Sequence, residues 1–319
     1  MIRQDSMNLQ VASVTCPVCE GGEISICDSY RGTHAIFFGI NRAQCRTCEM
    51  VFAAPMPNNN QLEEYNARYF DTAHGGISEN IIAKAFFTGI ARLRFSHLER
   101  YIQEHSTKVS NVLEMGPGTG YFAKVWIDKF PKTIYNVIET DSSCHNLLRE
   151  IGVHVINPST DKQNIDSIDL VVMSHVLEHV SSPIEFIAST TRNLKKGGVI
   201  FIEVPCRDWE HKPNDEPHLL FFDKKPMLYL LEKLGYVDIQ VSYHGIEIEK
   251  LRANQFLKTR WMAIRNKFIS MGMVSPFAKI RHGMEEIHNP VERAAVAPFK
   301  AHVESVNPSW WLRATARKK

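Results

Sequence analysis

The stretch NVLEMGPGTGYF, residues 111–122, decides the fold of this chain. A short apolar run precedes three glycines, Gly116, Gly118 and Gly120, and the residues that follow, YFAKVWIDKF, have the apolar spacing of a helix. A buried strand, a glycine turn and a helix in this order predict the start of a doubly wound α/β domain that binds a nucleotide-like ligand. A nicotinamide-binding loop, G-x-G-x-x-G, would need a glycine at position 121, where the chain has Tyr121.

The second expected strand, YNVIETD (135–141), ends in an acid. Glu139 stands at the end of the apolar run, where a carboxylate can accept hydrogen bonds from both ribose hydroxyls of a nucleoside. Asp141 is the competing acid, and either carboxylate could instead serve a helix N-terminus. Further strands are expected at 153–157, 168–174, 197–205, 236–245 and 309–319, with a helix ending at LKKGG (194–198) before the fifth strand.

Three motifs resemble those of class I S-adenosylmethionine-dependent methyltransferases, and the likeness spans residues 110–240. They are E-x-G-x-G-x-G at 114–120, D-x-V-x-x-x-x-V-L-E-H-V-x-x-P at 169–183 and L-K-x-G-G-x-x-x-x-E-V-P at 194–205. The resemblance implies a Rossmann-like, doubly wound, seven-stranded α/β sheet whose last strand, 309–319, is antiparallel. It also implies S-adenosylmethionine as the cofactor.

The same resemblance suggests which residues contact the cofactor. Gly116, Gly118 and Gly120 would let the backbone approach its amino-acid end, because they lack side chains. Glu114 would hold the ammonium group, directly or through water, and Glu139 would bind the ribose. The other candidates are Asn157 or Ser159 for the adenine, Ser174 at the end of the fourth strand, and Tyr69, which with Tyr65 and Phe70 could cover the cleft or simply pack.

Three histidines are candidates for the base that removes a proton from the methyl acceptor. His175 and His179 belong to H-x-x-E-H, which is also the inverted zinc-protease motif, but that motif needs a helix and here it directly follows a strand. His218 opens a segment that resembles the family's H-L-x-x-F and is the preferred base, because an imidazole accepts protons near neutral pH. A hydrogen-bonded structural histidine is the alternative at all three positions.

Four of the seven cysteines form two CxxC pairs, Cys16 with Cys19 and Cys45 with Cys48. Two such turns that face each other give a tetrahedral cage of sulfur ligands, which suits a structural Zn²⁺. Redox thiols, or coincidence, are the alternatives. The sequence therefore predicts a small zinc-ribbon-like head before the α/β core, with Cys27 as a bystander.

Composition excludes several classes of protein. The chain of 319 residues is 44% hydrophobic and 23% charged, with a net charge of +2. No apolar run approaches the ~18–20 residues of a membrane span, and the N-terminus lacks a secretory h-region. We therefore expect a cytoplasmic protein without a membrane partner. The near-neutral charge makes nucleic acid an unexpected partner.

The segments divide the chain into a zinc-binding head (1–60), a helical linker over the cofactor cleft (61–108), a methyltransferase core (109–245), a helical insertion (246–307) and the last strand (308–319). The insertion could form a lid or a dimer contact. Its residues Trp261, Met271 and Met273 are expected in the core.

The combination of a two-CxxC head, a helical linker and a methyltransferase core resembles bacterial methyltransferases of sugar, polysaccharide and natural-product pathways. It implies O- or C-methylation of a small-molecule acceptor by a monomer or homodimer. An RNA or protein methyltransferase and a non-catalytic, cofactor-binding scaffold are the alternatives.

Overall fold

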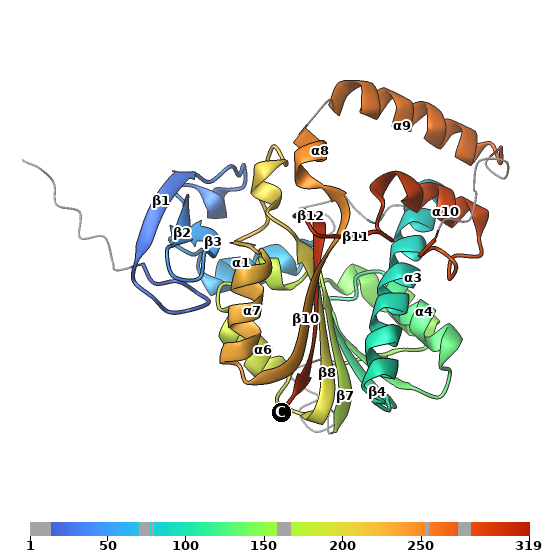
Figure 1. Cartoon of the computed structure of the whole chain (residues 1–319), viewed down its shortest axis with the longest axis horizontal. Helices are drawn as coiled ribbons and strands as arrows, with labels where there is room; N and C mark the ends of the chain where they lie inside the picture. The colour runs from blue at the N-terminus through green and yellow to red at the C-terminus, as the bar shows by residue number, and fades with distance from the viewer. Residues whose placement is uncertain (1–13, 70–76, 78–79, 158–166, 253–254, 274–281) are drawn as a thin grey trace, which may run out of the picture.

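The computed structural model describes residues 14–69, 77, 80–157, 167–252, 255–273 and 282–319. Its main element is a sheet of eight strands (Figure 1), in the order β11 (Glu304–Ser305), β10 (Tyr236–Glu247), β12 (Ser309–Lys318), β8 (Leu194–Pro205), β7 (Ile168–Ser174), β4 (Asn111–Met115), β5 (Ile134–Ile138) and β6 (His154–Val155). β12 is antiparallel to both of its neighbours, whereas β8, β7, β4, β5 and β6 are parallel. The predicted α/β sheet with an antiparallel last strand is confirmed, and the short β11 extends its edge.

Helices cover both faces of the sheet, as a doubly wound fold requires. In β7, Leu170 and Val172 pack into one core, while Val171 and Met173 pack into another on the opposite face. A strand buried on both faces is apolar at successive positions, which explains the run IDLVVM. The first face is covered by α3 (Ile81–Glu104), α4 (Tyr121–Lys129) and α5 (His145–Ile151), the second by α6 (Pro183–Thr190) and α7 (Lys224–Lys233).

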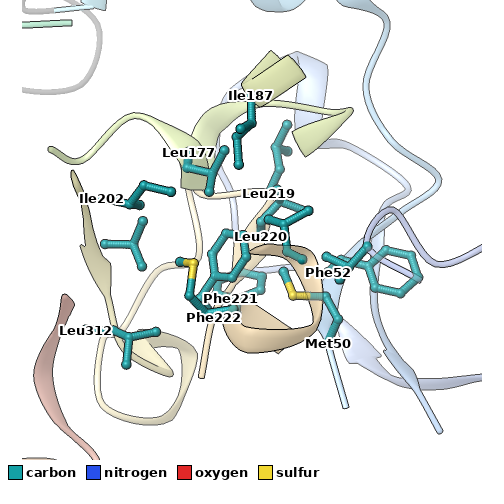
Figure 2. Close-up of a cluster of buried hydrophobic side chains, with 14 of the residues drawn as sticks. Met50, Phe52, Leu177, Ile187, Ile202, Leu219, Leu220, Phe221, Phe222 and Leu312 are labelled. Carbon is teal, nitrogen blue, oxygen red and sulfur yellow. The ribbon is translucent and has the colours of Figure 1, made fainter. Parts of the chain in front are cut away.

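The N-terminal head has its own sheet, in the order β1 (Ile24–Ser29), β2 (Asn41–Cys45), β3 (Val51–Ala54) and β9 (Leu220–Phe221). The fourth strand, β9, comes from the segment that follows β8, far outside residues 1–60. Phe52 of β3 is opposite Leu220 of β9, and the Ala53 amide donates to the Leu219 carbonyl at 2.8 Å. Figure 2 shows Met50 and Phe52 beside the 219–222 segment, so head and core share one hydrophobic cluster.

Two sequence expectations about strands and helices were wrong in detail. LKKGG does not end a helix, because α6 ends at Thr190 and these residues begin β8. Leu194 is opposite Ile168 but Val199 is opposite Leu170, so the extra residues bulge out of the strand where Gly197 has a φ of +75°. The third strand is also shorter than expected and covers His154–Val155.

The linker and the insertion contribute helices around this sheet. The linker has α1 (Asn59–Asn66) and the long α3, and most of the loop 71–80 between them lies outside the described residues, as does Phe70. The insertion has α8 (Ile248–Arg252), α9 (Gln255–Ser270) and α10 (Pro290–Val296). α10 packs closely on α3: a Cβ added at Gly89 would lie 2.4 Å from Val296 Cγ2.

The expectation that Trp261, Met271 and Met273 belong to the core was wrong. Their exposed fractions are 73%, 61% and 52%. Large apolar side chains predict burial from composition alone, but Trp261 lies on the exposed side of α9, and Met271 and Met273 lie in the exposed turn that follows it.

Candidate active site

The glycine loop joins β4 to α4 and needs glycine for two reasons. Gly116 and Gly120 have φ angles of +58° and +79°, in the left-handed region that side chains disfavour. A Cβ at Gly116 would also lie 2.7 Å from Val176 Cγ2, and one at Gly120 would lie 2.5 Å from Ile151 Cδ1. Gly118, between them, has a φ of +55°. The loop therefore packs directly against the segment that carries His175 and His179.

Glu139 lies at the end of β5 and faces the glycine loop. Its carboxylate accepts hydrogen bonds from the Gly118 amide and the Asp141 amide, both at 2.8 Å. Burial raises the pKa of Glu139, while these amides act in the opposite direction. Asp141 caps the turn that follows by accepting from the Ser143 amide at 3.0 Å. Of the two competing acids, Glu139 is the one beside the loop.

Glu114, in β4, is 2% exposed and lies on the face covered by α3 and α4. Its carboxylate accepts a hydrogen bond from the Tyr135 hydroxyl at 2.8 Å. Burial raises the pKa of Glu114 to about 7. The carboxyl group therefore changes its charge near neutral pH, which makes its interaction with a cationic ligand sensitive to pH.

The remaining candidate cofactor contacts lie at different places around the carboxyl edge of the sheet. Asn157 is exposed just after β6, and Ser159 lies outside the described residues. Ser174 ends β7, and its buried hydroxyl has no hydrogen-bond partner in the described part of the chain. Tyr69 makes an edge-to-face contact with His179, with ring centroids 5.4 Å apart.

His175 stands at the turn after β7, in a backbone conformation unusual for a non-glycine residue (φ +57°). Its ring lies between two carboxylates, with Nδ1 at 3.2 Å from Glu178 Oε1 and Nε2 at 3.3 Å from Glu203 Oε1. Burial alone would lower the pKa of His175, but the two carboxylates outweigh it and raise the pKa. The H-x-x-E-H segment is not an α-helix, since Leu177–His179 (η3) is a single 3-10 turn. The helical zinc-protease geometry therefore does not form.

Glu203, at the carboxyl end of β8, is held by two arginines that the sequence did not single out. Arg94 of α3 donates to its Oε1 at 2.7 Å, and Arg313 of β12 donates to its Oε2 at 2.7 Å. Burial opposes ionisation of Glu203, but the arginines and His175 outweigh it and lower its pKa. This buried ionic network fixes the position of the His175 ring.

His218 is oriented by a carboxylate that the sequence also did not single out. Its Nδ1 lies 2.6 Å from Oδ2 of Asp208, which belongs to a 3-10 turn, η4 (Asp208–Glu210), and which Lys212 also contacts at 3.0 Å. Burial would raise the pKa of Asp208, but His218 and Lys212 lower it. An ionised Asp208 accepts the hydrogen bond from Nδ1–H and so favours the tautomer in which Nε2 carries the lone pair.

His179 and Glu178 complete a polar cluster with His218. The rings of His179 and His218 meet edge to face, 4.9 Å apart. Burial lowers the pKa of His179 to about 4. Burial would raise the pKa of Glu178, but the neighbouring histidines outweigh this effect and lower the pKa of Glu178 to about 2. Glu178 Oε2 and His179 Nε2 are buried and form no hydrogen bond within the described part of the chain, whereas Glu178 Oε1 faces His175 Nδ1 at 3.2 Å.

This arrangement of a carboxylate and two imidazoles can perform two kinds of chemistry. It can bind and deprotonate a hydroxyl-bearing molecule, because Asp208 orients one imidazole as a proton acceptor. Its three ligand atoms, one each from Glu178, His179 and His218, also lie within 4.8 Å of one another, close enough to hold a cation.

Comparison with known proteins shows the family. A family model described as "Methyltransferase domain" matches residues 90–272, which is more than half of the chain. The chain belongs to the methyltransferase domain family. With the glycine loop and the strand order already described, it is an S-adenosylmethionine-dependent methyltransferase.

Solved structures of other methyltransferases resemble this one at low identity. A possible histamine N-methyltransferase from Thermotoga maritima has 16% identity and a TM-score of 0.42, with 73% of this chain and 100% of that chain covered. An S-adenosylmethionine-dependent methyltransferase from Archaeoglobus fulgidus has 16% identity and a TM-score of 0.44, with coverages of 78% and 98%. The plantazolicin methyltransferase bound to S-adenosylhomocysteine has 14% identity and a TM-score of 0.43, with coverages of 82% and 98%.

The head of the methyltransferase brings its four CxxC cysteines together. Cys16 Sγ lies 3.4 Å from Cys48 Sγ, and Cys19 Sγ lies 3.4 Å from Cys45 Sγ. All four sulfur atoms lie within 4.8 Å of one another. Hydrogen bonding to Cys48 lowers the pKa of Cys16 to about 5. Four sulfur atoms at these spacings fit the tetrahedral shell of a Zn²⁺ ion, whereas Cys27 is exposed and apart from them.

The head also supports the loop that carries His218. The Tyr30 hydroxyl donates to the His218 carbonyl at 2.9 Å. Arg31 and Arg42 both donate to the buried carboxylate of Asp215, which precedes His218 by three residues. The His218 amide in turn donates to the Asp215 carbonyl at 2.9 Å. The head therefore contacts the candidate active site of the methyltransferase directly.

No helix among the described residues is long and apolar enough to cross a membrane.

Proposed function

We propose that this methyltransferase transfers a methyl group from S-adenosylmethionine to a small, hydroxyl-bearing acceptor, such as a sugar, a nucleotide sugar or a natural-product intermediate. The observation that carries the proposal is a group of buried polar atoms at the carboxyl edge of the sheet that have no hydrogen bond among the described residues: the Ser174 hydroxyl, Glu178 Oε2 and His179 Nε2. A buried polar atom without a partner is costly, so these atoms favour ligands with hydroxyl groups. The acceptor atom would be oxygen or carbon.

The cofactor would lie across the ends of β4, β5 and β7. Gly116, Gly118 and Gly120 would allow its amino-acid end to approach the backbone, and Glu114 would interact with its ammonium group. Glu139 would exchange its bonds to the loop amides for ribose hydroxyls. The other residues proposed to contact the cofactor are Asn157, Ser174 and Tyr69.

The bound cofactor supplies an activated methyl group on a sulfonium. The protein has to align the acceptor behind that group and remove its proton. His218 is the proposed base, because Asp208 orients its imidazole as in other carboxylate–histidine pairs. His179, which is neutral at physiological pH because of burial, is the second candidate. His175 is the third candidate, and because both of its ring nitrogens already face carboxylates, it would have to give up its contact with Glu178 or Glu203 to reach a substrate.

The four cysteines Cys16, Cys19, Cys45 and Cys48 would hold a structural zinc ion. Four thiolates fill a tetrahedral shell and leave no position for a substrate, so the metal would stabilise the head and not take part in methyl transfer. The contacts of the head with Asp215 and His218 support a division in which the head folds around zinc and braces the active-site loop of the core.

The first test is calorimetric titration of the zinc-loaded protein with S-adenosylmethionine and, as a control, NAD. We expect binding of the former alone. The second test measures release of S-adenosylhomocysteine with a panel of sugars, nucleoside-diphosphate sugars and phenols. With a responding acceptor, His218→Asn and Asp208→Asn should each lower kcat by about 100-fold or more without weakening cofactor binding.

The control variant is His105→Asn, whose side chain bonds the Tyr101 carbonyl away from the cluster and which should keep full activity. Normal cofactor binding with unchanged kcat in His218→Asn would refute the assignment of the base. Failure of every small acceptor, with tight cofactor binding, would contradict the proposed acceptor class.

A further inference from the structure

α9 presents an apolar face that the described part of the chain does not cover. Trp261, Ile264 and Phe268 are 73%, 52% and 45% exposed. These positions, three and four residues apart, lie on one side of a helix. Met271 and Met273, in the turn that follows, are exposed as well, at 61% and 52%.

The opposite side of α9 is packed, so the exposure does not result from a helix without tertiary contacts. Ile269 is 4% exposed and packs in a cluster with Ala294 of α10 and Ile82 of α3. In Figure 1 α9 runs along the outer edge of the molecule, beside α10. The exposed face therefore points away from the body of the protein.

Basic residues flank the apolar face on both sides. At about 100° per residue, Arg260 and Lys267 fall next to Ile264 on one flank and Arg265 falls next to Trp261 on the other. Residues 251–284 contain seven Lys or Arg and no Asp or Glu. An apolar stripe with Trp and Phe, bordered by cations, is the pattern of helices that lie in the interface of a bilayer.

We propose that the exposed face of α9 binds the surface of an anionic lipid bilayer. Trp261, Ile264 and Phe268 would enter the boundary between headgroups and acyl chains, and the flanking basic residues would meet the lipid phosphates. A second copy of this chain fits less well, because the charged residues between positions 251 and 284 are all basic and two apposed α9 faces would bring like charges together. The helix would lie on the bilayer surface and not cross it, and no helix among the described residues is long and apolar enough to cross. This proposal departs from the sequence-based expectation of no membrane partner, which rested on the lack of a spanning apolar run.

Sedimentation with lipid vesicles tests the proposal without measuring methyl transfer. The intact protein should bind vesicles of phosphatidylcholine with phosphatidylglycerol and bind pure phosphatidylcholine poorly. Trp261→Ser with Phe268→Ser should lower partitioning by more than about tenfold. Arg260→Gln with Lys267→Gln should lower it by about fivefold per charge and only for anionic vesicles. Ile134→Ser, which removes an apolar side chain 53% exposed on β5, should change nothing.

Two results would overturn the proposal. One is equal binding of the intact protein and of Trp261→Ser with Phe268→Ser to anionic vesicles, or no binding by either. The other is an oligomer of the intact protein, detected by light scattering, that the double variant Trp261→Ser, Phe268→Ser does not form, with no vesicle binding by either protein. The exposed face of α9 would then join copies of this chain. Circular dichroism and calorimetric titration with S-adenosylmethionine verify that the variants are folded.

Discussion

Asp215 joins the head of the methyltransferase to the loop that carries His218, and its removal should separate the two. The side chain is 1% exposed and accepts from Arg31 at 2.6 Å and Arg42 at 3.0 Å. Its carbonyl also accepts from the His218 amide. In Asp215→Asn, the guanidinium of Arg42, a residue that is 6% exposed, would lose its buried carboxylate.

The expected cost follows from the burial of these partners. Removing one member of a buried ion pair costs about 3–5 kcal/mol, because the other charge stays desolvated. Arg31 is partly exposed and Arg42 keeps its contact with Asp28 at 2.9 Å, so we expect about 3 kcal/mol for Asp215→Asn. Asp28→Asn removes the other partner of Arg42, but Asp28 is exposed, and this matched control should cost less than about 1 kcal/mol.

Urea unfolding of the zinc-loaded protein measures both costs. A double-mutant cycle with Arg42→Gln isolates the pair, and transfer of zinc to a coloured chelator reports on loosening of the head. Asp215→Asn should also lower kcat, because the His218 loop loses its support, and should leave the affinity for S-adenosylmethionine within about twofold. A loss no larger than that of Asp28→Asn would refute this account of the junction.

Three other predictions concern the cofactor, the metal and pH. Glu139→Ala should weaken S-adenosylmethionine binding in calorimetry by about tenfold or more, since each charge-assisted hydrogen bond to ribose contributes about 1.5 kcal/mol; unchanged affinity would contradict the ribose assignment. Cys45→Ser should release the zinc ion, as measured by mass spectrometry, and destabilise the head while the core stays folded. The control Cys27→Ser should keep the zinc ion. A second zinc ion per chain would indicate a metal site at Glu178, His179 and His218. Burial and nearby arginines lower the pKa of His97 to about 3, so the unfolded chain binds a proton that the folded chain does not. Stability should therefore fall as pH drops from about 6.5 toward 3, by up to about 2 kcal/mol at pH of about 5, and the urea midpoint of His97→Gln should vary less over this range.

Several features could be read from the sequence because short-range rules govern them. The loop of Gly116, Gly118 and Gly120 needs left-handed backbone angles that few other residues tolerate, so its glycines reveal the turn. The run of successive apolar residues in β7 likewise follows from a strand whose side chains point alternately to two covered faces of the sheet. Two CxxC pairs predict that four sulfur atoms meet, and the structure brings them together.

Other features depend on contacts between segments far apart in the chain. Nothing near Glu203 in the sequence points to Arg94, 109 residues away. Asp208 is only ten residues before His218, but Glu210, Asp215 and Glu216 lie between them, and no local pattern selects Asp208 among these acids. The sequence of the head likewise gives no sign that β9 completes its sheet. Such pairs arise from strand register and side-chain packing, which no local pattern encodes.

The sequence by itself determined the strand–loop–helix start of the core, the parallel α/β class and the cysteine pairs, because these depend on backbone angles and spacings within a few residues. The tertiary structure alone decided which carboxylate orients each histidine, how the head reaches the active-site loop and which apolar residues of α9 stay exposed. These follow from the three-dimensional packing of distant segments, where burial and charge are set by neighbours that the linear order does not reveal.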